Sequence, residues 1–325
     1  MDTLENSGVD HVVIRRVPAS RGTAWLLDSY RVYLRHPWLW TFLIALASLI
    51  SFGFGRLGFI GSLIQGTLSL FFGMGLALGV QSVQQGQKLE FETLFKSFQS
   101  KNLALIGVAL FNYFWLYFSL AIGLLVFLGM VGTSVFSEFT KLGSLANSDS
   151  PNLGQLKESL MPLLGFFWPA WAAFWVAILV YVAGTMASLF APFLIALKNV
   201  SFSKALRQSF RACGVNVWPL TVYGLILASY SLFVMVICFA LLSKMIFALK
   251  DIDLTLFAKT DSTQITQTLA AVADPFQIIL VAAFGIVAFL LIVPAVSFSF
   301  YFAYADIFDL KKEEINPSPK PLRPV

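Results

Sequence analysis

The chain has 325 residues, of which 58% are hydrophobic and 12% charged, whereas soluble domains carry about 25% charged residues. A water-soluble globule of this composition would have too little polar surface, and 33 phenylalanines exclude a disordered chain because disordered segments lack apolar side chains. Two cysteines are too few for a disulfide framework or a cysteine-rich metal site. The composition therefore predicts an all-α integral membrane protein.

The first 37 residues are basic and lack the early apolar core of a cleavable signal peptide. We therefore expect the first apolar segment to stay in the membrane as an anchor. The predicted organisation has a basic cytoplasmic N-terminus with an interfacial helix (1–37), a six-helix transmembrane domain (38–310) and a mobile, proline-rich cytoplasmic tail (311–325).

Six apolar stretches are long enough to cross a hydrocarbon layer, which takes about 20 helical residues because backbone polar groups must pair internally there. A cluster of glycines between the first two predicts a tight turn. Pro192 predicts a kink in the fourth, and Pro294 lies inside the sixth, where a neighbouring side chain can satisfy the freed carbonyl. The expected spans are 38–54, 59–83, 103–131, 163–197, 217–242 and 276–302.

The positive charges are unevenly distributed between these spans. With six crossings, most of the 22 lysines and arginines fall on the side that also holds both termini. Short loops rich in lysine and arginine stay in the cytoplasm, so both termini are expected there. The net charge of +5 then reflects topology and attraction to anionic lipids, and we expect no nucleic-acid partner.

A short pattern precedes the first, third and fifth spans. In each copy a leucine is followed by serine three residues later, then by an aromatic residue and by arginine or glutamine; the copies are LLDSYR (26–31), LFKSFQ (94–99) and LRQSFR (206–211). Helical spacing places the leucine and the aromatic residue on one face, which suits a helix lying in the head-group layer. The pattern therefore predicts three repeats, each with a cytoplasmic amphipathic interfacial helix followed by a two-span hairpin. The alternative is chance, because short patterns of common residues recur easily.

Basic residues of these predicted interfacial helices are the candidate contacts for lipid head groups: Arg31, Arg35, Lys96, Arg207 and Arg211. Asn112 lies among aromatic residues and is the candidate for a groove that binds an acyl chain or an amphiphile, with aromatic packing as the alternative. Gln65 and Asn216 are expected to hydrogen-bond between helices.

Catalytic and metal-binding patterns are missing from the sequence. His11 and His36 are the only histidines, which excludes a histidine-rich zinc site, and there is no GxSxG nucleophile motif. The glycines of 73–79 lie inside an apolar span and indicate close helix packing. We expect no cofactor, metal or catalytic residue.

Two other features carry predictions. Asp306 and Asp309 are expected to act as a tether by pairing with Lys311, Lys312 or an arginine of an interfacial helix. The segments 133–162 and 244–275 are expected to be outward-facing connectors, the second with a short polar helix ending at Asp274–Pro275; the alternative for these segments is a binding lid.

The segment RRVPASRGTAWLLDSYRVYLRHPWLW (15–40) resembles the amino-terminal signature of an uncharacterised family of proteobacterial multi-span inner-membrane proteins. The three helix-and-hairpin units also look like the membrane domain that precedes some glycerophosphoryl diester phosphodiesterases. The resemblance implies a bacterial inner-membrane location and a six-helix domain. It implies no catalytic residues, because these 325 residues contain no soluble phosphodiesterase domain.

These observations favour a non-enzymatic inner-membrane protein that acts through membrane lipids or a membrane-protein partner in envelope maintenance. The alternative is a small transporter or permease for an amphiphilic or hydrophobic solute.

Overall fold

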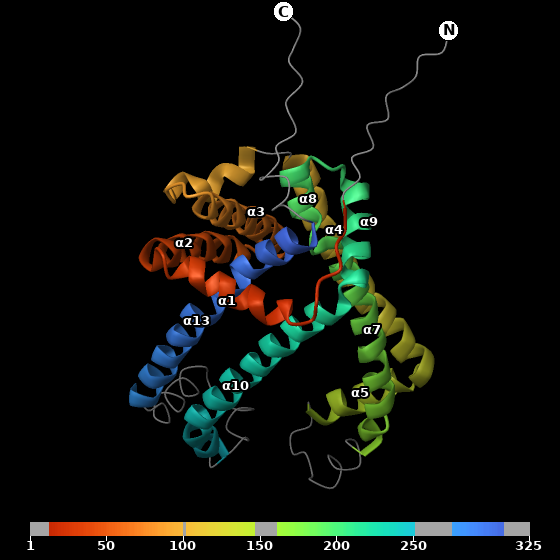
Figure 1. Cartoon of the computed structure of the whole chain (residues 1–325). Helices are drawn as coiled ribbons and strands as arrows, with labels where there is room; N and C mark the ends of the chain where they lie inside the picture. Colours follow the sequence, from red (N-terminus) through yellow and green to blue (C-terminus); the bar gives the residue numbers. More distant parts are fainter. Residues whose placement is uncertain (1–12, 100–101, 147–160, 251–274, 309–325) are drawn as a thin grey trace, which may run out of the picture. The chain divides into compact units, whose positions relative to one another are not determined.

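The computed structural model describes residues 13–99, 102–146, 161–250 and 275–308 (Figure 1). All of its regular structure within these ranges is helical, which confirms the all-α prediction. The helices are α1 (Arg21–Tyr33), α2 (Pro37–Gly55), α3 (Gly58–Gln84), the 3₁₀ helix η1 (Phe91–Gln99), α4 (Asn102–Val131), α5 (Ser134–Ala146), α7 (Phe167–Ser188), α8 (Ala191–Lys198), α9 (Phe202–Val215), α10 (Val217–Lys250) and α13 (Pro275–Ile307).

Six helical segments of the described chain are long and apolar enough to cross a membrane, so the prediction of a multi-pass membrane protein is confirmed at this level. They are Pro37–Gly55, Gly58–Gln84, Leu103–Val131, Met161–Lys198, Val217–Ser243 and Ile278–Ile307. Each overlaps one of the six predicted stretches.

The segments 133–162 and 244–275 differ from the expected connectors. Helix α5 occupies Ser134–Ala146, where no helix was predicted, and α10 continues to Lys250. The polar helix expected before Pro275 lies outside the described residues, as does the tail 311–325.

The fourth span breaks where Pro192 was expected to kink it. α7 ends at Ser188 and α8 begins at Ala191 with Pro192 in its first turn. Ser209 of α9 bridges the break. Its hydroxyl donates a hydrogen bond to the carbonyl of Met186 at 2.8 Å and accepts one from the amide of Phe190 at 2.9 Å. In a continuous helix that amide and that carbonyl would bond to each other. The serine hydroxyl therefore replaces one missing bond of the helix ladder.

Contacts between residues divide the chain into two compact units. One comprises Met1–Ile50, Phe72–Ser97 and Val215–Val325, and the other Ser51–Phe71 and Phe98–Gly214. We describe them separately as the α1 unit and the α4 unit.

In the α4 unit, α4 packs along α7 (Figure 1). Small residues allow this close approach: a Cβ atom at Gly123 would lie 2.8 Å from Cβ of Ala177, and one at Gly184 would overlap the indole of Trp115. The Trp115 indole donates to the carbonyl of Val180 at 2.7 Å. Close packing between small residues and an interhelical hydrogen bond are the usual associations between membrane helices.

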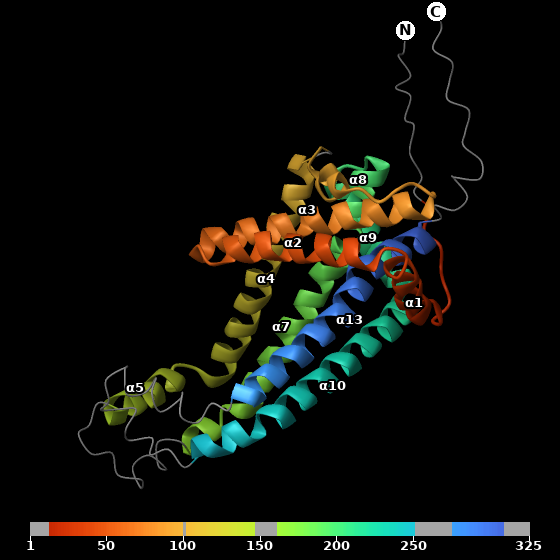
Figure 2. The ribbon, with the colours of Figure 1, turned by 90° about the vertical axis from the view of Figure 1, so that its left-hand side faces the viewer.

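In the α1 unit, α1 begins beside the first turns of α10 and crosses α13 (Figure 1), and α10 and α13 run side by side (Figure 2). A Cβ atom at Gly22 would overlap the carbonyl oxygen of Pro219, so glycine permits α1 to touch the backbone of α10. The Tyr30 hydroxyl donates to the carbonyl of Leu291, in the turn before Pro294. Pro294 leaves the carbonyl of Leu290 without its helical donor, so the Tyr30 bond falls on the next carbonyl along α13.

Burial raises the pKa of Tyr30, and the nearby Tyr230 and Tyr33 raise it further. The hydroxyl therefore stays protonated at neutral pH and keeps its capacity to donate to α13.

Asn216 joins the start of α10 to the segment before α1. Its side-chain amide donates to the carbonyl of Arg15 at 2.9 Å, and its side-chain oxygen accepts the amide of Val17 at 2.9 Å. The amide of Arg15 in turn donates to the carbonyl of Ile307 at 2.8 Å. Asn216 is fully buried, and both of these bonds go to the non-helical segment 13–18.

Two glycines of α3 lie against neighbouring elements. A Cβ atom at Gly75 would overlap the carbonyl oxygen of Leu94 in η1, and one at Gly79 would lie 2.9 Å from the Trp40 ring. A Cβ atom at Gly73 would meet nothing within 4 Å. The predicted close packing is confirmed at Gly75 and Gly79 and not at Gly73.

Gly75→Ala is expected to destabilise the α1 unit by about 1–3 kcal/mol, the usual cost of overpacking, because the obstructing atom is backbone. Gly73→Ala is the matched control in the same helix, and its thermal midpoint should be unchanged or slightly raised, since alanine favours helix. Thermal unfolding of the purified proteins in detergent measures both. Equal midpoints for the two variants would contradict the packing of η1 on α3.

Candidate functional site

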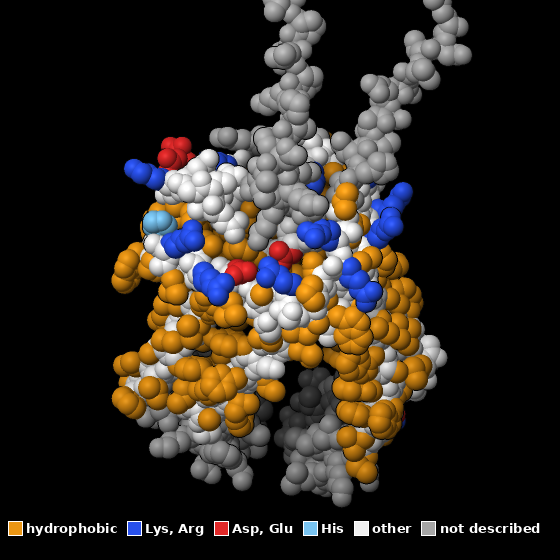
Figure 3. Space-filling model, viewed as in Figure 1, with side chains coloured by type: hydrophobic (Ala, Val, Ile, Leu, Met, Phe, Trp, Pro, Cys, Tyr) orange, Lys and Arg blue, Asp and Glu red, His pale blue; other side chains and the backbone are white. Residues whose placement is uncertain are grey.

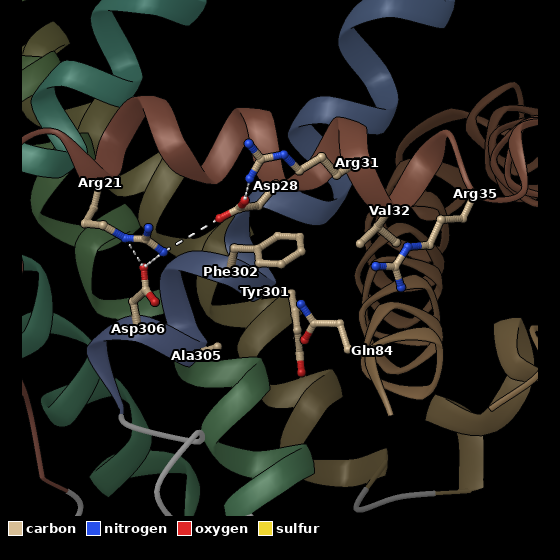
Figure 4. Close-up of a pocket in the computed structure, with 10 residues that line it drawn as sticks. All are labelled: Arg21, Asp28, Arg31, Val32, Arg35, Gln84, Tyr301, Phe302, Ala305 and Asp306. Carbon is tan, nitrogen blue, oxygen red and sulfur yellow. Dashed lines mark hydrogen bonds and ion pairs between the residues drawn. The ribbon is translucent and has the colours of Figure 1, made fainter. Parts of the chain in front are cut away.

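A charged pocket of about 390 Å³ lies within the α1 unit. It is formed by α1 and the corner after it, by the end of α3 and by the last turns of α13 (Figure 4). Its lining residues are Arg21, Asp28, Arg31, Val32, Arg35, Gln84, Tyr301, Phe302, Ala305 and Asp306.

The register of α1 presents its charged residues to this pocket. Gly22, Trp25, Ser29 and Val32 are the buried positions, and their spacing of three and four defines one helical face. Because that face packs inward, Asp28 and Arg31 lie on its flank. Arg35 follows the end of the helix, just before α2 begins.

Asp306 holds α1 to α13. Its Oδ2 atom lies 2.6 Å from Nε and 2.5 Å from Nη2 of Arg21, and it also accepts the Trp25 indole at 2.8 Å. Among the partners that the sequence allowed for Asp306, the structure shows an arginine of the helix before the first span. Asp309, Lys311 and Lys312 lie outside the described residues.

The remaining charges of the pocket are less completely paired. Asp28 accepts a hydrogen bond from Arg31 at 2.9 Å and lies 3.7 Å from Arg21. The Arg31 side chain is 75% exposed, so this pair adds little stability. The guanidinium of Arg35 has no ion pair or hydrogen bond within the described ranges. Three arginines face two carboxylates, which leaves one positive charge in excess.

The pocket lies at the ends of two candidate spans. Gln84 is the last residue of α3, and Tyr301 to Asp306 belong to the last turns of α13. Charged side chains gather around α1, whereas apolar side chains cover the lower parts of α13 and α10 (Figure 3). The pocket therefore lies where two helices long enough to cross a membrane end.

Arg31 and Arg35 are the two candidate head-group contacts that the structure brings together. Lys96 is exposed on η1 of the same unit and does not line the pocket. Arg207 and Arg211 are exposed on α9, which belongs to the α4 unit.

Asn112 is half-buried on α4. A groove of about 310 Å³ does run between α4 and α7, lined by Leu120, Gly123, Leu124, Phe127, Ala170, Ala173, Phe174 and Ala177. Asn112 precedes this groove on α4 and does not line it. The neighbouring Tyr113 and Trp115 use their polar atoms to bond the carbonyls of Ser62 and Val180, so the aromatic residues around Asn112 serve at least partly in packing.

Sequence reasoning missed the contributions of Arg21 and Gln84 to the pocket and the role of the shared serine. Ser29, Ser97 and Ser209 occupy the same position in the three copies of the pattern, and all three are fully buried. The pattern had been interpreted through its leucine and aromatic residue. A small hydroxyl residue at the same position of all three copies was the available signal for such burial, and at Ser209 it lies against the backbone of another helix.

Within the residues that the structure describes, no group of three or more histidine, cysteine, aspartate or glutamate side chains is arranged to hold a metal ion. No family model, curated protein or solved structure matches the chain. The resemblance of 15–40 to proteobacterial inner-membrane proteins therefore stays a prediction.

Asp306→Asn is expected to lower the free energy of unfolding by about 1–2 kcal/mol, because it removes a charged hydrogen-bond acceptor from Arg21. Asp28→Asn should cost less, since the Arg31 side chain that it releases is exposed. Thermal unfolding of the two variants in the same detergent compares them. If both variants lowered the thermal midpoint equally, the bonds of Asp306 to α1 would contribute no more stability than the exposed pair of Asp28 and Arg31.

Cys213 of α9 is fully buried, and burial raises the pKa of its thiol to about 12, although a hydrogen bond with Ser209 lowers it. Because thiolate is the reactive form, alkylation at pH 8 in a Cys238→Ala background should be roughly a thousandfold slower than at the exposed control Ser203→Cys. The rates are measured by mass spectrometry of the folded protein.

The same shift has a defined sign for stability. The thiol of the unfolded chain ionises near pH 9.0, so Cys213 contributes stability below that pH and loses it as the pH rises toward 12. The stability of Cys213→Ala should therefore fall less than that of the wild type as the pH rises from 9 toward 12. Rapid alkylation of Cys213 in the folded protein would contradict its burial.

Proposed function

We propose that this chain is a non-enzymatic, multi-pass protein of the bacterial inner membrane that acts through lipid or partner contacts in envelope maintenance. Both termini lie in the cytoplasm in this proposal. The positive-charge bias of the loops supports that orientation, and the resemblance of 15–40 supports the bacterial membrane.

The proposed arrangement has three hairpins, each preceded by an interfacial helix: α1, η1 and α9. Contacts of α4 with α7 and of α10 with α13 support two of them. For the first, the turn between α2 and α3 supports the pairing, because the amide of Leu57 bonds to the carbonyl of Phe54 and Gly58 has a φ of 71°, which suits glycine.

The observation that carries the proposal is the position of the basic side chains. Arg31, Lys96, Arg207 and Arg211 are exposed on α1, η1 and α9, the helices that precede spans. Basic residues near an anionic leaflet contribute about 1 kcal/mol each to attraction. Such a distribution favours persistent binding of anionic lipid over a path for solute through the bundle.

Protein extracted from bacterial membranes into polymer-bounded lipid discs should carry a higher ratio of anionic to zwitterionic lipid than the bulk membrane. The double variant Arg207→Gln/Arg211→Gln should lower this ratio, because it removes two exposed charges from α9. Lipid mass spectrometry of the discs measures it.

Arg56→Gln is the control, since Arg56 is exposed in the turn between α2 and α3, on the other proposed side of the membrane. If discs with the wild-type protein had the same ratio of anionic to zwitterionic lipid as the bulk membrane, the proposal would be contradicted. Flux of an amphiphilic dye through proteoliposomes above the protein-free level would instead favour a transporter.

A further inference from the structure

The charged pocket of the α1 unit has a size and composition suited to one small polar group. Its volume of about 390 Å³ falls within the range of about 300–1,000 Å³ that ligand sites occupy. The guanidinium of Arg35 and the amide of Gln84 are both directed toward the space beside Tyr301 (Figure 4). Val32 and Phe302 supply apolar surface to the same pocket.

The charge balance of the pocket selects among anions. Asp306 is engaged by Arg21 at 2.5 Å and Asp28 by Arg31 at 2.9 Å, which leaves Arg35 as the cation without an ion pair in the described chain. A phosphate monoester carries a charge of about −1.5 to −2 at pH 7, whereas a phosphodiester carries one negative charge. One unbalanced arginine matches the phosphodiester, and an arginine fork can bind two phosphoryl oxygens at once.

The position of the pocket selects the source of that group. Gln84 ends one candidate span, and the α13 residues of the pocket are in the last turns of another, so the ligand approaches from the head-group layer. Both carboxylates already face arginines, and neither is left to receive the ammonium of a zwitterionic head group.

We infer that this pocket binds the phosphodiester of one anionic phospholipid, with Arg35 as the principal contact and Gln84 as a hydrogen-bonding group for the polar head. The inference rests on the proposed function and deepens it. It replaces diffuse attraction at the three interfacial helices with one stoichiometric site in the α1 unit.

Native mass spectrometry of the purified full chain, incubated with equal amounts of phosphatidylglycerol and phosphatidylethanolamine, tests the site. The wild-type protein should retain one phosphatidylglycerol in preference to phosphatidylethanolamine. Arg35→Gln should weaken that adduct by about tenfold or more, the scale of a charged hydrogen-bond pair, and Arg35→Lys should restore part of it. Arg56→Gln, which removes an exposed charge in the turn between α2 and α3, outside the pocket, should leave the adduct intact.

The thermal midpoint of Arg35→Gln serves as the control for correct folding. It should equal that of the wild type because Arg35 has no ion pair among the described residues. Equal phosphatidylglycerol retention by wild type and Arg35→Gln would overturn the site, while anionic lipid enriched around both would leave the proposed function standing. A wild-type protein with no anionic preference would overturn both. In a second incubation that adds inorganic phosphate to the two lipids, retention of phosphate in place of lipid would overturn the assignment to a phospholipid.

Discussion

Hydrocarbon offers no partner for an unpaired amide or carbonyl, and this constraint accounts for the most informative contacts in the structure. A helix that crosses the membrane satisfies its own backbone until proline or a break interrupts the ladder. At the break between α7 and α8, the hydroxyl of Ser209 stands between the amide of Phe190 and the carbonyl of Met186. In α13, where Pro294 leaves the carbonyl of Leu290 without its helical donor, the hydroxyl of Tyr30 bonds the neighbouring carbonyl of Leu291.

Both of these hydroxyl groups come from helices outside the spans, and both belong to the short pattern that precedes a span. α1 and α9 are thus more than surface elements, because each supplies a hydroxyl to the backbone of an apolar helix, α9 at the break between α7 and α8 and α1 one turn before Pro294 of α13. α1 is fastened further by Asp306 to Arg21 and Trp25. Once the inward face of α1 is fixed in this way, the remaining charge of Arg35 falls beside the ends of α3 and α13.

The spans were predictable because the signal is summed over about 20 residues; the residues from Val217 to Ser243, for example, contain no charged side chain. The break at Pro192 was predictable from one residue, since proline lacks the amide that the ladder needs. The pocket was predictable only in part. Arg31 and Arg35 were identified from charge near a span, but no local pattern relates them to Gln84 or Asp306, which are far away in sequence.

Asn216 shows the same limit. Its polarity within an apolar region indicated a hydrogen bond, but the sequence could not specify that its partners are the backbone groups of Arg15 and Val17. Tertiary partners of a polar side chain depend on how helices cross, and helix crossing depends on local features such as the close contact of Gly22 with Pro219.

The proposed function requires α1 and the neighbouring ends of α3 and α13 to lie at the cytoplasmic surface of the membrane. Ser20 is exposed just before α1, so Ser20→Cys in a protein whose Cys213 and Cys238 are replaced by alanine reports the side directly. A membrane-impermeant maleimide should label it in inside-out vesicles and leave it unlabelled in intact spheroplasts. Labelling in spheroplasts alone would contradict the account.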